Sequence, residues 1–448
     1  MGNNPSQGVL GFGGMGPQRK REPGHAYARC MGKIRQRRRF CGRCGAETQA
    51  DDKFCQSCGH ELGEGGPQTQ APDGPSPRHA SGNETPNEGV APAVRAFLRP
   101  VLEAEITPGM EPVGVVALAR ECEEAGFDRV GISDVILWPD SFMLQALVAA
   151  GTERVEIGAM VTNPYSRHPA VLASAVATLD EISGGRAFLG LGVGAGLEAI
   201  GIDYPRPVRT LRESIAVIRS LLDGEAVGFA GEMMSLEPSR LVRPAGSRLP
   251  VVIGTRSPAV MRLAGEVADR VLVGARYLSP ELASTYRVWL SEGAERAGRD
   301  ADLIEVAPRL TLCASEDGEV ARASVKRYVA HYVSLLRPVE LGLKPGWLDD
   351  VDAALDRSKG WYFDHARHDD PELDRLIDDD LVRKFAVAGT PKECAELLGT
   401  ALDLGFTSLS CNLVAVRRAG NTMKSGLSET ISAFAEVFER RGWLTAVR

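Results

Sequence analysis

The sequence contains no long apolar run. None of its apolar stretches reaches the roughly 18 residues that a membrane-spanning helix needs, so we expect no membrane segment. Apolar residues make up 44% and charged residues 25% of the 448-residue chain, which is typical of a globular protein. A secretory leader is also lacking, because the first apolar stretch, residues 9–12, is short and contains glycine. We therefore expect a cytoplasmic protein.

Residues 1–38 lack any helical or strand period and are rich in glycine, proline and arginine, which predicts a disordered tail. Residues 1–60 carry 11 Lys/Arg against 4 Asp/Glu, whereas the rest of the chain carries 41 against 55. This asymmetry suggests different partners for the two parts. The basic run "KIRQRRRF" is suited to contact nucleic acid or protein, but no aromatic residue is interleaved, so we favour a solvated tail.

Cysteine is scarce except in one short segment. Four of the nine cysteines form two CxxC pairs, each followed by glycine: Cys41, Cys44, Cys55 and Cys58. Thiolates at this spacing can close a tetrahedral zinc site, which would stabilise a segment too short to build a core. A redox dithiol and a pair of disulfides are the alternatives. Because all four ligands are cysteines, we predict a structural zinc ribbon at residues 39–62 with no open catalytic position.

The other five cysteines are scattered, and we expect them to be small buried side chains rather than disulfides. Residues 63–96 are rich in glycine and proline and predict a flexible linker. From residue 97 to 448, apolar runs alternate with stretches of helical period. We predict eight strands near residues 101–106, 129–133, 154–161, 186–192, 250–254, 270–274, 304–313 and 406–414.

Eight strands alternating with helices predict an α/β fold of the (β/α)8 TIM-barrel class, with active residues at the C-terminal ends of the strands. Two segments depart from this pattern. Residues 224–248 are expected to form a small hairpin, and residues 338–388 a helical insertion before the eighth strand. An insertion of this length near the barrel mouth is expected to act as a lid or a wall.

Several segments of the sequence, spread over most of residues 101–440, resemble those of a known family. The run "VTNPYSRHPAVLASAVATLDEISGGRAFLGLGVG", together with "GTERVEIG", "PVVIGTRSPAVMRLAGEVADRVLVGA" and "FAVAGTPKECAELL", resembles the luciferase-like superfamily of flavin and deazaflavin oxidoreductases. Within it, the chain is most similar to methylenetetrahydromethanopterin reductases. The resemblance implies the same barrel that the strand count predicts. It also implies a cofactor that carries a hydride, either coenzyme F420 or FMN, and a small-molecule substrate.

The resemblance further implies a non-proline cis peptide after the third strand, at Met160–Val161, in a bulge that supports the cofactor ring. The adjoining Thr162 and Asn163, and the glycines Gly192 and Gly194 that end the fourth strand, are the expected neighbours of that ring. Glycines there would leave room for a flat ligand, although close strand packing explains them equally well.

Two carboxylates are candidate catalytic residues by the same resemblance. Glu105 lies in the first strand, inside the predicted barrel, and Asp134 follows the second strand. Family members often have Asp-His where this chain has Asp134-Val135. The missing histidine leaves the substrate open, and it also leaves open whether the barrel is catalytic at all.

A phosphate site is predicted after the fifth strand. Gly254, Thr255 and Arg256 precede Ser257, the expected N-cap, and Pro258, the expected first helical residue. Free N–H groups at a helix N-terminus and a neighbouring guanidinium favour a phosphate, although an ordinary capped helix fits the same residues.

Three functions remain open at this stage: an F420-dependent oxidoreductase, which we favour, an FMN-dependent monooxygenase, and a non-catalytic module that binds nucleic acid or protein. We also expect a homodimer through the small-residue helix at residues 169–182 and its neighbour, because so apolar a surface is poorly suited to face water.

The cysteine spacing yields the first testable prediction. The fragment 36–64 should bind one zinc ion per chain through Cys41, Cys44, Cys55 and Cys58, and should lose its fold in a chelator, because the metal supplies most of its folding free energy. Metal analysis and circular dichroism with and without chelator measure this. A fragment without zinc, or one that folds equally well with chelator, would contradict the prediction.

Overall fold

This computed structural model describes residues 39–40, 47–48, 99–246, 248–274, 276–277, 279–338, 341–358 and 371–443. The four cysteines predicted to bind zinc, the basic tail and the linker lie outside the described residues. Two short strands before the barrel, β1 (Arg39–Phe40) and β2 (Glu47–Thr48), pair antiparallel.

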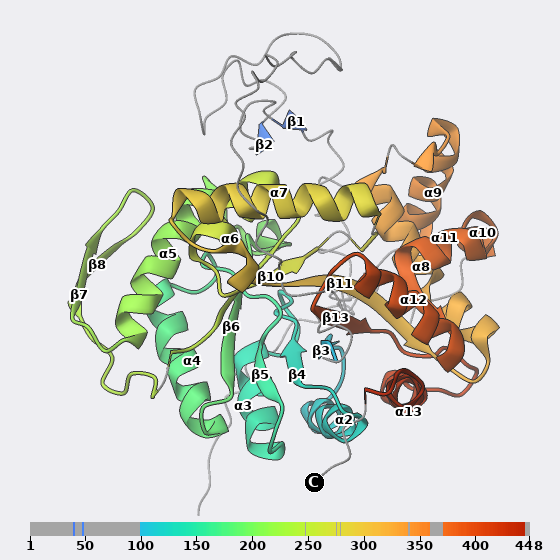
Figure 1. The fold of residues 1–448 in the computed structure, drawn as a ribbon, viewed down its shortest axis with the longest axis horizontal. Helices are drawn as coiled ribbons and strands as arrows, with labels where there is room; N and C mark the ends of the chain where they lie inside the picture. The colour runs from blue at the N-terminus through green and yellow to red at the C-terminus, as the bar shows by residue number, and fades with distance from the viewer. Residues whose placement is uncertain are drawn as a thin grey trace, which may run out of the picture.

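A closed barrel of eight parallel strands forms the body of the protein (Figure 1). Each barrel strand pairs with the next barrel strand along the chain, and the pairing of the last strand, β13, with the first, β3, closes the ring. The strands are β3 (Val101–Ile106), β4 (Arg129–Ile132), β5 (Glu156–Ala159), β6 (Ala187–Leu191), β9 (Val251–Thr255), β10 (Arg270–Val273), β11 (Glu305–Ala314) and β13 (Ser408–Leu413). The eight predicted strands are thereby confirmed to within a few residues.

Helices cover the outside of the barrel (Figure 1). They are α2 (Pro112–Ala125), α3 (Ser141–Gly151), α4 (Pro169–Ser183), α5 (Pro207–Leu222), α6 (Pro258–Val267), α7 (Pro280–Arg296), α8 (Gly318–Leu336), α12 (Pro391–Asp403) and α13 (Met423–Arg441), with 3-10 turns η2 (Leu197–Ile200) and η3 (Ala301–Leu303). Local sequence sets many of their ends. Helix α4, for example, begins at a proline, whose fixed φ suits the first turn, and stops at Gly184 with φ 70°.

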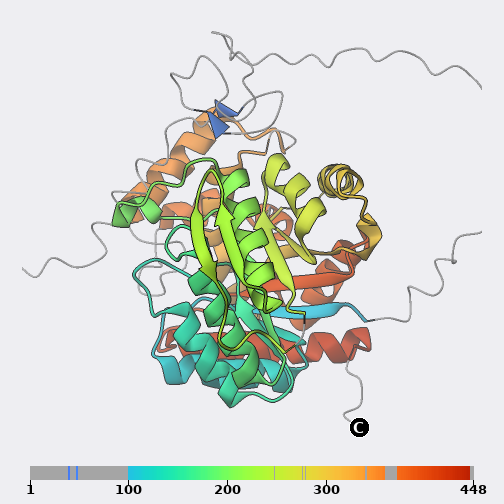
Figure 2. The ribbon, with the colours of Figure 1, turned by 90° about the vertical axis from the view of Figure 1, so that its left-hand side faces the viewer.

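Both predicted departures from the barrel are present. Strands β7 (Val227–Ala230) and β8 (Ser235–Ser239) form an antiparallel hairpin outside α5, which faces the viewer in Figure 2. The described part of the insertion consists of α9 (Pro345–Ser358), α10 (Pro371–Leu376) and α11 (Asp379–Phe385).

The insertion was predicted to extend to residue 388, but its last helix, α11, ends at Phe385. Residues Ala386–Gly389 form a further strand, β12, which is parallel to the end of β11. The prediction was wrong here because only four residues are extended, too few for an alternating pattern to be recognised.

The insertion helices share an apolar core with α8, and Cys313 of β11 also belongs to this core. Tyr328, Val329 and Tyr332 of α8 are buried with Val351 of α9 and Leu373 of α10. The insertion is thus anchored on the α8 side of the barrel. Among the described residues, no helix is both long enough and apolar enough to cross a membrane.

Charged side chains close the N-terminal end of the barrel lumen. Arg129 of β4 pairs with Glu156 of β5 and reaches Glu305 of β11, and Arg270 of β10 pairs with Glu156 as well. Each guanidinium therefore has carboxylate partners. Above them lie the apolar side chains of Met160, Phe188, Val252 and Leu272, which pack together.

Glu103 of β3 lies among these lumen residues and is 6% exposed. Burial raises its pKa to about 7, against the opposing effects of a hydrogen bond with Ser410 and the charge of Arg129. In the unfolded chain the pKa is 4.5, so between pH 4.5 and 7 the folded state holds a proton that the unfolded state has released. The free energy of unfolding must therefore fall as pH rises through this window.

We predict that Glu103→Gln removes this fall, because glutamine is neutral at every pH. Relative to wild type, the variant should gain roughly 3 kcal/mol of unfolding free energy between pH 4.5 and 8, as measured by urea denaturation. Glu123→Gln is the control, since Glu123 does not act on Glu103. Burial alone would raise the pKa of Glu123, but the main-chain N–H groups of Val155, Arg154 and Glu153 lower it below 4.5, so the effect of this change should stay nearly constant across the window. Parallel pH curves for wild type and Glu103→Gln would contradict the prediction.

Candidate active site

The segment after β5 has the predicted backbone. The Met160–Val161 peptide is cis and not followed by proline, as the family resemblance implied. The next residue, Thr162, is fully buried and joins the segment to β6, since its N–H donates to the carbonyl of Gly190 and its carbonyl accepts from the N–H of Gly192. Before the cis peptide, the N–H of Met160 donates to the carbonyl of Ile132, so the chain is fixed on both sides of the bulge.

Three glycines hold the Val161 side chain. A Cβ at Gly192 would lie 2.7 Å from Val161 Cγ2, and one at Gly254 would lie 3.0 Å from Val161 Cγ1. At Gly190, a Cβ would meet the carbonyl oxygen of Ala159 at 2.0 Å. The room that these glycines leave is thus occupied by Val161 and by the β5 backbone, which accounts for the alternation by close packing.

Glu105 lies where predicted, on β3 inside the barrel, and is fully buried. One of its oxygens accepts a hydrogen bond from Ser133 Oγ at 2.7 Å, and both oxygens accept from the guanidinium of Arg309 on β11. A two-pronged ion pair and a hydroxyl donor together fix the orientation of the carboxylate. Glu105 is therefore suited to hold the end of β4 against β11.

Asp134 contacts the bulge directly. Its Oδ2 accepts a hydrogen bond from Thr162 Oγ1 at 2.6 Å. Burial raises the pKa of Asp134, while the Thr162 hydrogen bond and the charge of Arg167 act in the opposite direction. A carboxyl with a raised pKa at the mouth of a barrel is suited to exchange a proton with a ligand.

The two carboxylates are linked through consecutive residues. Ser133 donates to Glu105, and the next residue, Asp134, accepts from Thr162. The end of β4 thereby connects the lumen ion pair to the bulge after β5. The structure brings Glu105, Asp134 and Thr162 together, and this arrangement can transfer a proton to or from a molecule placed against Val161.

Asn163 has a role that the sequence did not indicate. Its side-chain oxygen accepts hydrogen bonds from the N–H groups of Tyr165 and Ser166, which forms the turn that leads to α4. Gly194 has φ 80°, and a Cβ there would lie 3.2 Å from the Asn163 Cβ. Both residues therefore shape the backbone at the barrel mouth.

The predicted phosphate loop also has the expected form. Ser257 is the N-cap of α6 and Pro258 follows it, but the Ser257 side chain makes no capping hydrogen bond. Instead its N–H donates to Thr255 Oγ1 at 2.9 Å. The first turn of α6 therefore has no capping side chain on its N–H groups, and the exposed Arg256 stands beside it.

Sequence reasoning missed Ser133 and Arg309. Glu305, Ala307 and Arg309 are two residues apart along β11 and therefore share one face of the strand. This period-2 alternation was the signal in the sequence that could have identified Arg309 as a residue of the barrel lumen. Its partner, Glu105, is 204 residues away in sequence, and no local pattern joins them.

Two protein-family models match this chain. The family model for luciferase-like monooxygenases matches residues 95–408, and the model for a zinc-ribbon domain matches residues 40–62. The chain is 32% identical to 5,10-methylenetetrahydromethanopterin reductase of Methanolobus tindarius over 310 residues, covering 68% of this chain and 91% of the relative.

Two solved structures share the fold. The coenzyme F420-dependent tetrahydromethanopterin reductase from Methanopyrus kandleri has a TM-score of 0.65 at 25% identity, and the match covers 76% of this chain and 100% of that one. The monooxygenase RslO1 from Streptomyces bottropensis has a TM-score of 0.57 at 19% identity, with 76% and 99% covered. The second likeness concerns the fold alone.

Proposed function

We propose that this chain, which belongs to the luciferase-like monooxygenase family, is an oxidoreductase that transfers a hydride between coenzyme F420 and a small organic substrate. The observation that carries the proposal is the contact between Asp134 and Thr162, which joins the end of β4 to a segment after β5 that is itself fixed to β6. Similarity to an F420-dependent reductase supports the deazaflavin over FMN.

The residues at the barrel mouth fit such a cofactor. Val161, supported from behind by Gly192 and Gly254, offers a small apolar surface for one face of a planar ring. The first turn of α6, with Arg256 beside it, suits the cofactor phosphate. When bound, the cofactor would supply the hydride, and the protein orients it.

We assign different roles to the two carboxylates. Asp134 carries the proton that accompanies hydride transfer, because burial raises its pKa and its Oδ2 lies beside the bulge. Glu105 keeps the end of β4 in place through Ser133 and holds a fixed negative charge against Arg309. Val135, where relatives often have histidine, leaves the site without an imidazole at that position.

An FMN-dependent monooxygenase is the second candidate. The loop at Arg256 suits the phosphate of either cofactor, and a monooxygenase shares the fold. The non-catalytic alternative is weaker, because the bulge and both carboxylates are retained. For the N-terminal segment we propose a structural zinc bound by Cys41, Cys44, Cys55 and Cys58, which the zinc-ribbon match supports.

Replacing Arg256 tests the cofactor site. Arg256→Ala should weaken cofactor binding by about 1–3 kcal/mol, because one charged hydrogen bond to the phosphate is lost. Wild type and variant are titrated with F420 and with FMN, and the affinities are compared. Arg240→Ala, an exposed arginine on the hairpin side of the barrel, controls for net charge. Equal affinities of wild type and Arg256→Ala would refute the phosphate site, and tight binding of FMN alone would refute the deazaflavin assignment.

We also propose a homodimer through α3 and α4. These neighbouring helices expose apolar side chains on their outer faces, with Met143 70%, Leu147 49%, Val171 55% and Ile182 44% exposed. Isolated apolar residues are common on surfaces, but four on two adjacent helices form a patch that favours a partner.

The double variant Met143→Glu/Leu147→Glu should disrupt this dimer. Charges in an apolar interface should raise its dissociation constant by about 100-fold or more, so the variant should sediment as a monomer at micromolar concentration. Leu303→Glu, at an 82% exposed position in η3, is the matched control and should remain dimeric. A wild-type monomer at that concentration would exclude the proposed interface.

A further inference from the structure

Arg276 is a buried cation with unused hydrogen-bond donors. It follows β10, has φ 61°, and is 2% exposed. Its Nη1 donates to Thr311 Oγ1 at 3.2 Å, and its guanidinium lies 4.9 Å from the ring centre of Tyr332. Its Nε and Nη2 have no hydrogen-bond partner, and within the described ranges no carboxylate pairs with it.

Other arginines show what a structural role requires. Arg186 donates to four main-chain carbonyls, those of Ala149, Thr152, Val155 and Ser183. Arg418 bonds to Ser315 and Glu429 and pairs with Asp317. Both guanidinium groups are thus engaged through several donors, whereas Arg276 has one long bond to a neutral hydroxyl.

Burial without a counter-charge is energetically unfavourable. A guanidinium removed from water loses several kcal/mol of hydration, and one ring contact and one neutral hydrogen bond offset only part of this. A water molecule would satisfy an N–H but would not neutralise the charge. An anion that accepts from Nε and Nη2 would do both, and these two groups form the side of the fork that binds carboxylates and phosphates.

The place of Arg276 in the fold relates it to the proposed active site. Thr311 lies on the same face of β11 as Arg309, two residues nearer the C-terminal end. In the sheet register, Thr311 is opposite Asn412, and Asn412 is opposite Glu105. Arg276 therefore lies at the end of the barrel where the carboxylates lie, on the β10–β11 side.

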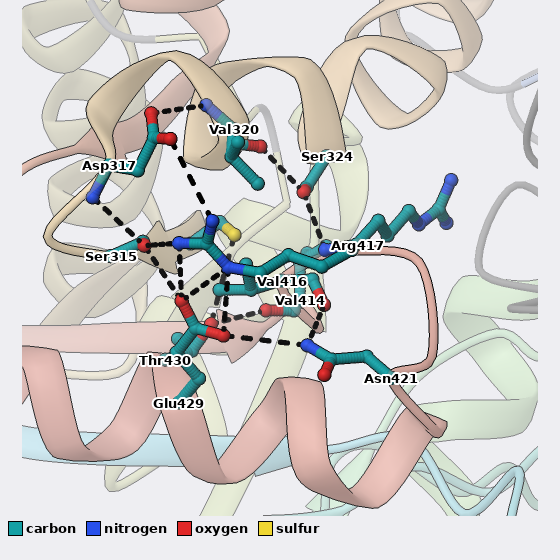
Figure 3. A network of polar contacts seen from close by, with 12 residues as sticks. Ser315, Asp317, Val320, Ser324, Val414, Val416, Arg417, Asn421, Glu429 and Thr430 are labelled. Atoms are coloured by element: carbon teal, nitrogen blue, oxygen red, sulfur yellow. Dashed lines mark hydrogen bonds and ion pairs between the residues drawn. The ribbon is translucent and has the colours of Figure 1, made fainter.

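Tyrosines and a second arginine surround this position. Tyr328 and Tyr332, one turn apart on α8, are both buried, and the charges of Arg276 and Arg417 both act on Tyr328. Figure 3 shows the Arg417 side chain extending away from the Ser315–Glu429 network, while its N–H donates to Ser324 Oγ. Two guanidinium groups therefore act on the buried Tyr328 from this side of the barrel.

We propose that Arg276 binds an anionic group, a carboxylate or a phosphate, of the substrate of this enzyme. The inference rests on the proposed function for the existence of a substrate, but its anion chemistry rests on Arg276 alone. It deepens the function by restricting the substrate to organic acids and phosphate esters.

The test uses the full-length chain and inorganic phosphate as the probe. All proteins carry Arg256→Ala, so that the proposed cofactor phosphate site does not contribute. Calorimetric titration should give at least about tenfold weaker phosphate binding in Arg276→Gln, because two charged hydrogen bonds are lost. Arg276→Lys keeps the charge but lacks the guanidinium fork, so its phosphate affinity should lie between those of the parent and Arg276→Gln. It also serves as the second variant if Arg276→Gln does not fold.

Thermal unfolding without phosphate distinguishes a structural role. We expect Arg276→Gln to be at least as stable as its parent, since an unpaired buried charge is removed. Equal phosphate affinities in the parent, the glutamine variant and the lysine variant, with lower stability of the variants, would overturn the proposal. An acetate titration on the same proteins separates carboxylate from phosphate preference.

Cofactor titration tests whether the anionic group that Arg276 binds belongs to the substrate or to the cofactor. Arg276→Gln alone, with Arg256 intact, should bind F420 within twofold of wild type. A tenfold loss would assign the anion to the cofactor and overturn the substrate assignment. If wild type binds neither F420 nor FMN, the proposed function fails, whereas the phosphate titration still decides whether Arg276 is an anion site.

Discussion

The close approach of β5 and β6 is the constraint on which the rest of the site depends. A Cβ at Gly158 would lie 2.2 Å from the carbonyl oxygen of Phe188, and one at Gly190 would lie 2.0 Å from that of Ala159. Only glycine allows the two backbones to come this near. The approach brings Val161 against β6 and β9 and places Thr162 within reach of Asp134. Without it, the bulge would have no fixed position relative to the carboxylates.

Charge is distributed along the barrel axis in two different ways. At the N-terminal end, Arg129 and Arg270 are each balanced by Glu156 and Glu305, and these side chains are fully engaged with one another. At the C-terminal end, Glu105 is balanced by Arg309, but Asp134 and Arg276 have only neutral hydrogen-bond partners. Groups that bind or react must keep some capacity for a ligand, and only the C-terminal end retains it.

Much of the fold could be predicted from the sequence, because apolar period and turn residues are local signals. The eight strands and the hairpin were predicted from these local signals, whereas the cis peptide was predicted from the family resemblance. Contacts across the barrel could not be found. Arg309 and Glu105 meet only because β11 and β3 both flank β13. The side chain of Val161 fills the space left by Gly192 and Gly254, and this depends on a backbone geometry that composition does not encode. The zinc-ribbon match bears out that part of the prediction, whereas the bound zinc ion and the proposed roles of the site residues stay predictions.

The C-terminal end of the barrel divides into two halves with different support. The groups that fit a cofactor come from β5, β6, β9 and the start of α6, where short loops and glycines fix the backbone. Arg276, Thr311 and Tyr332 come from the β10, β11 and α8 side, where α8 shares its core with the inserted helices α9 and α10. A shared core makes the position of Tyr332, and hence the ring beneath the Arg276 guanidinium, depend on how the insertion packs. Changes in the insertion would then alter the substrate half through α8 while leaving the bulge, which β6 and β4 hold, in place.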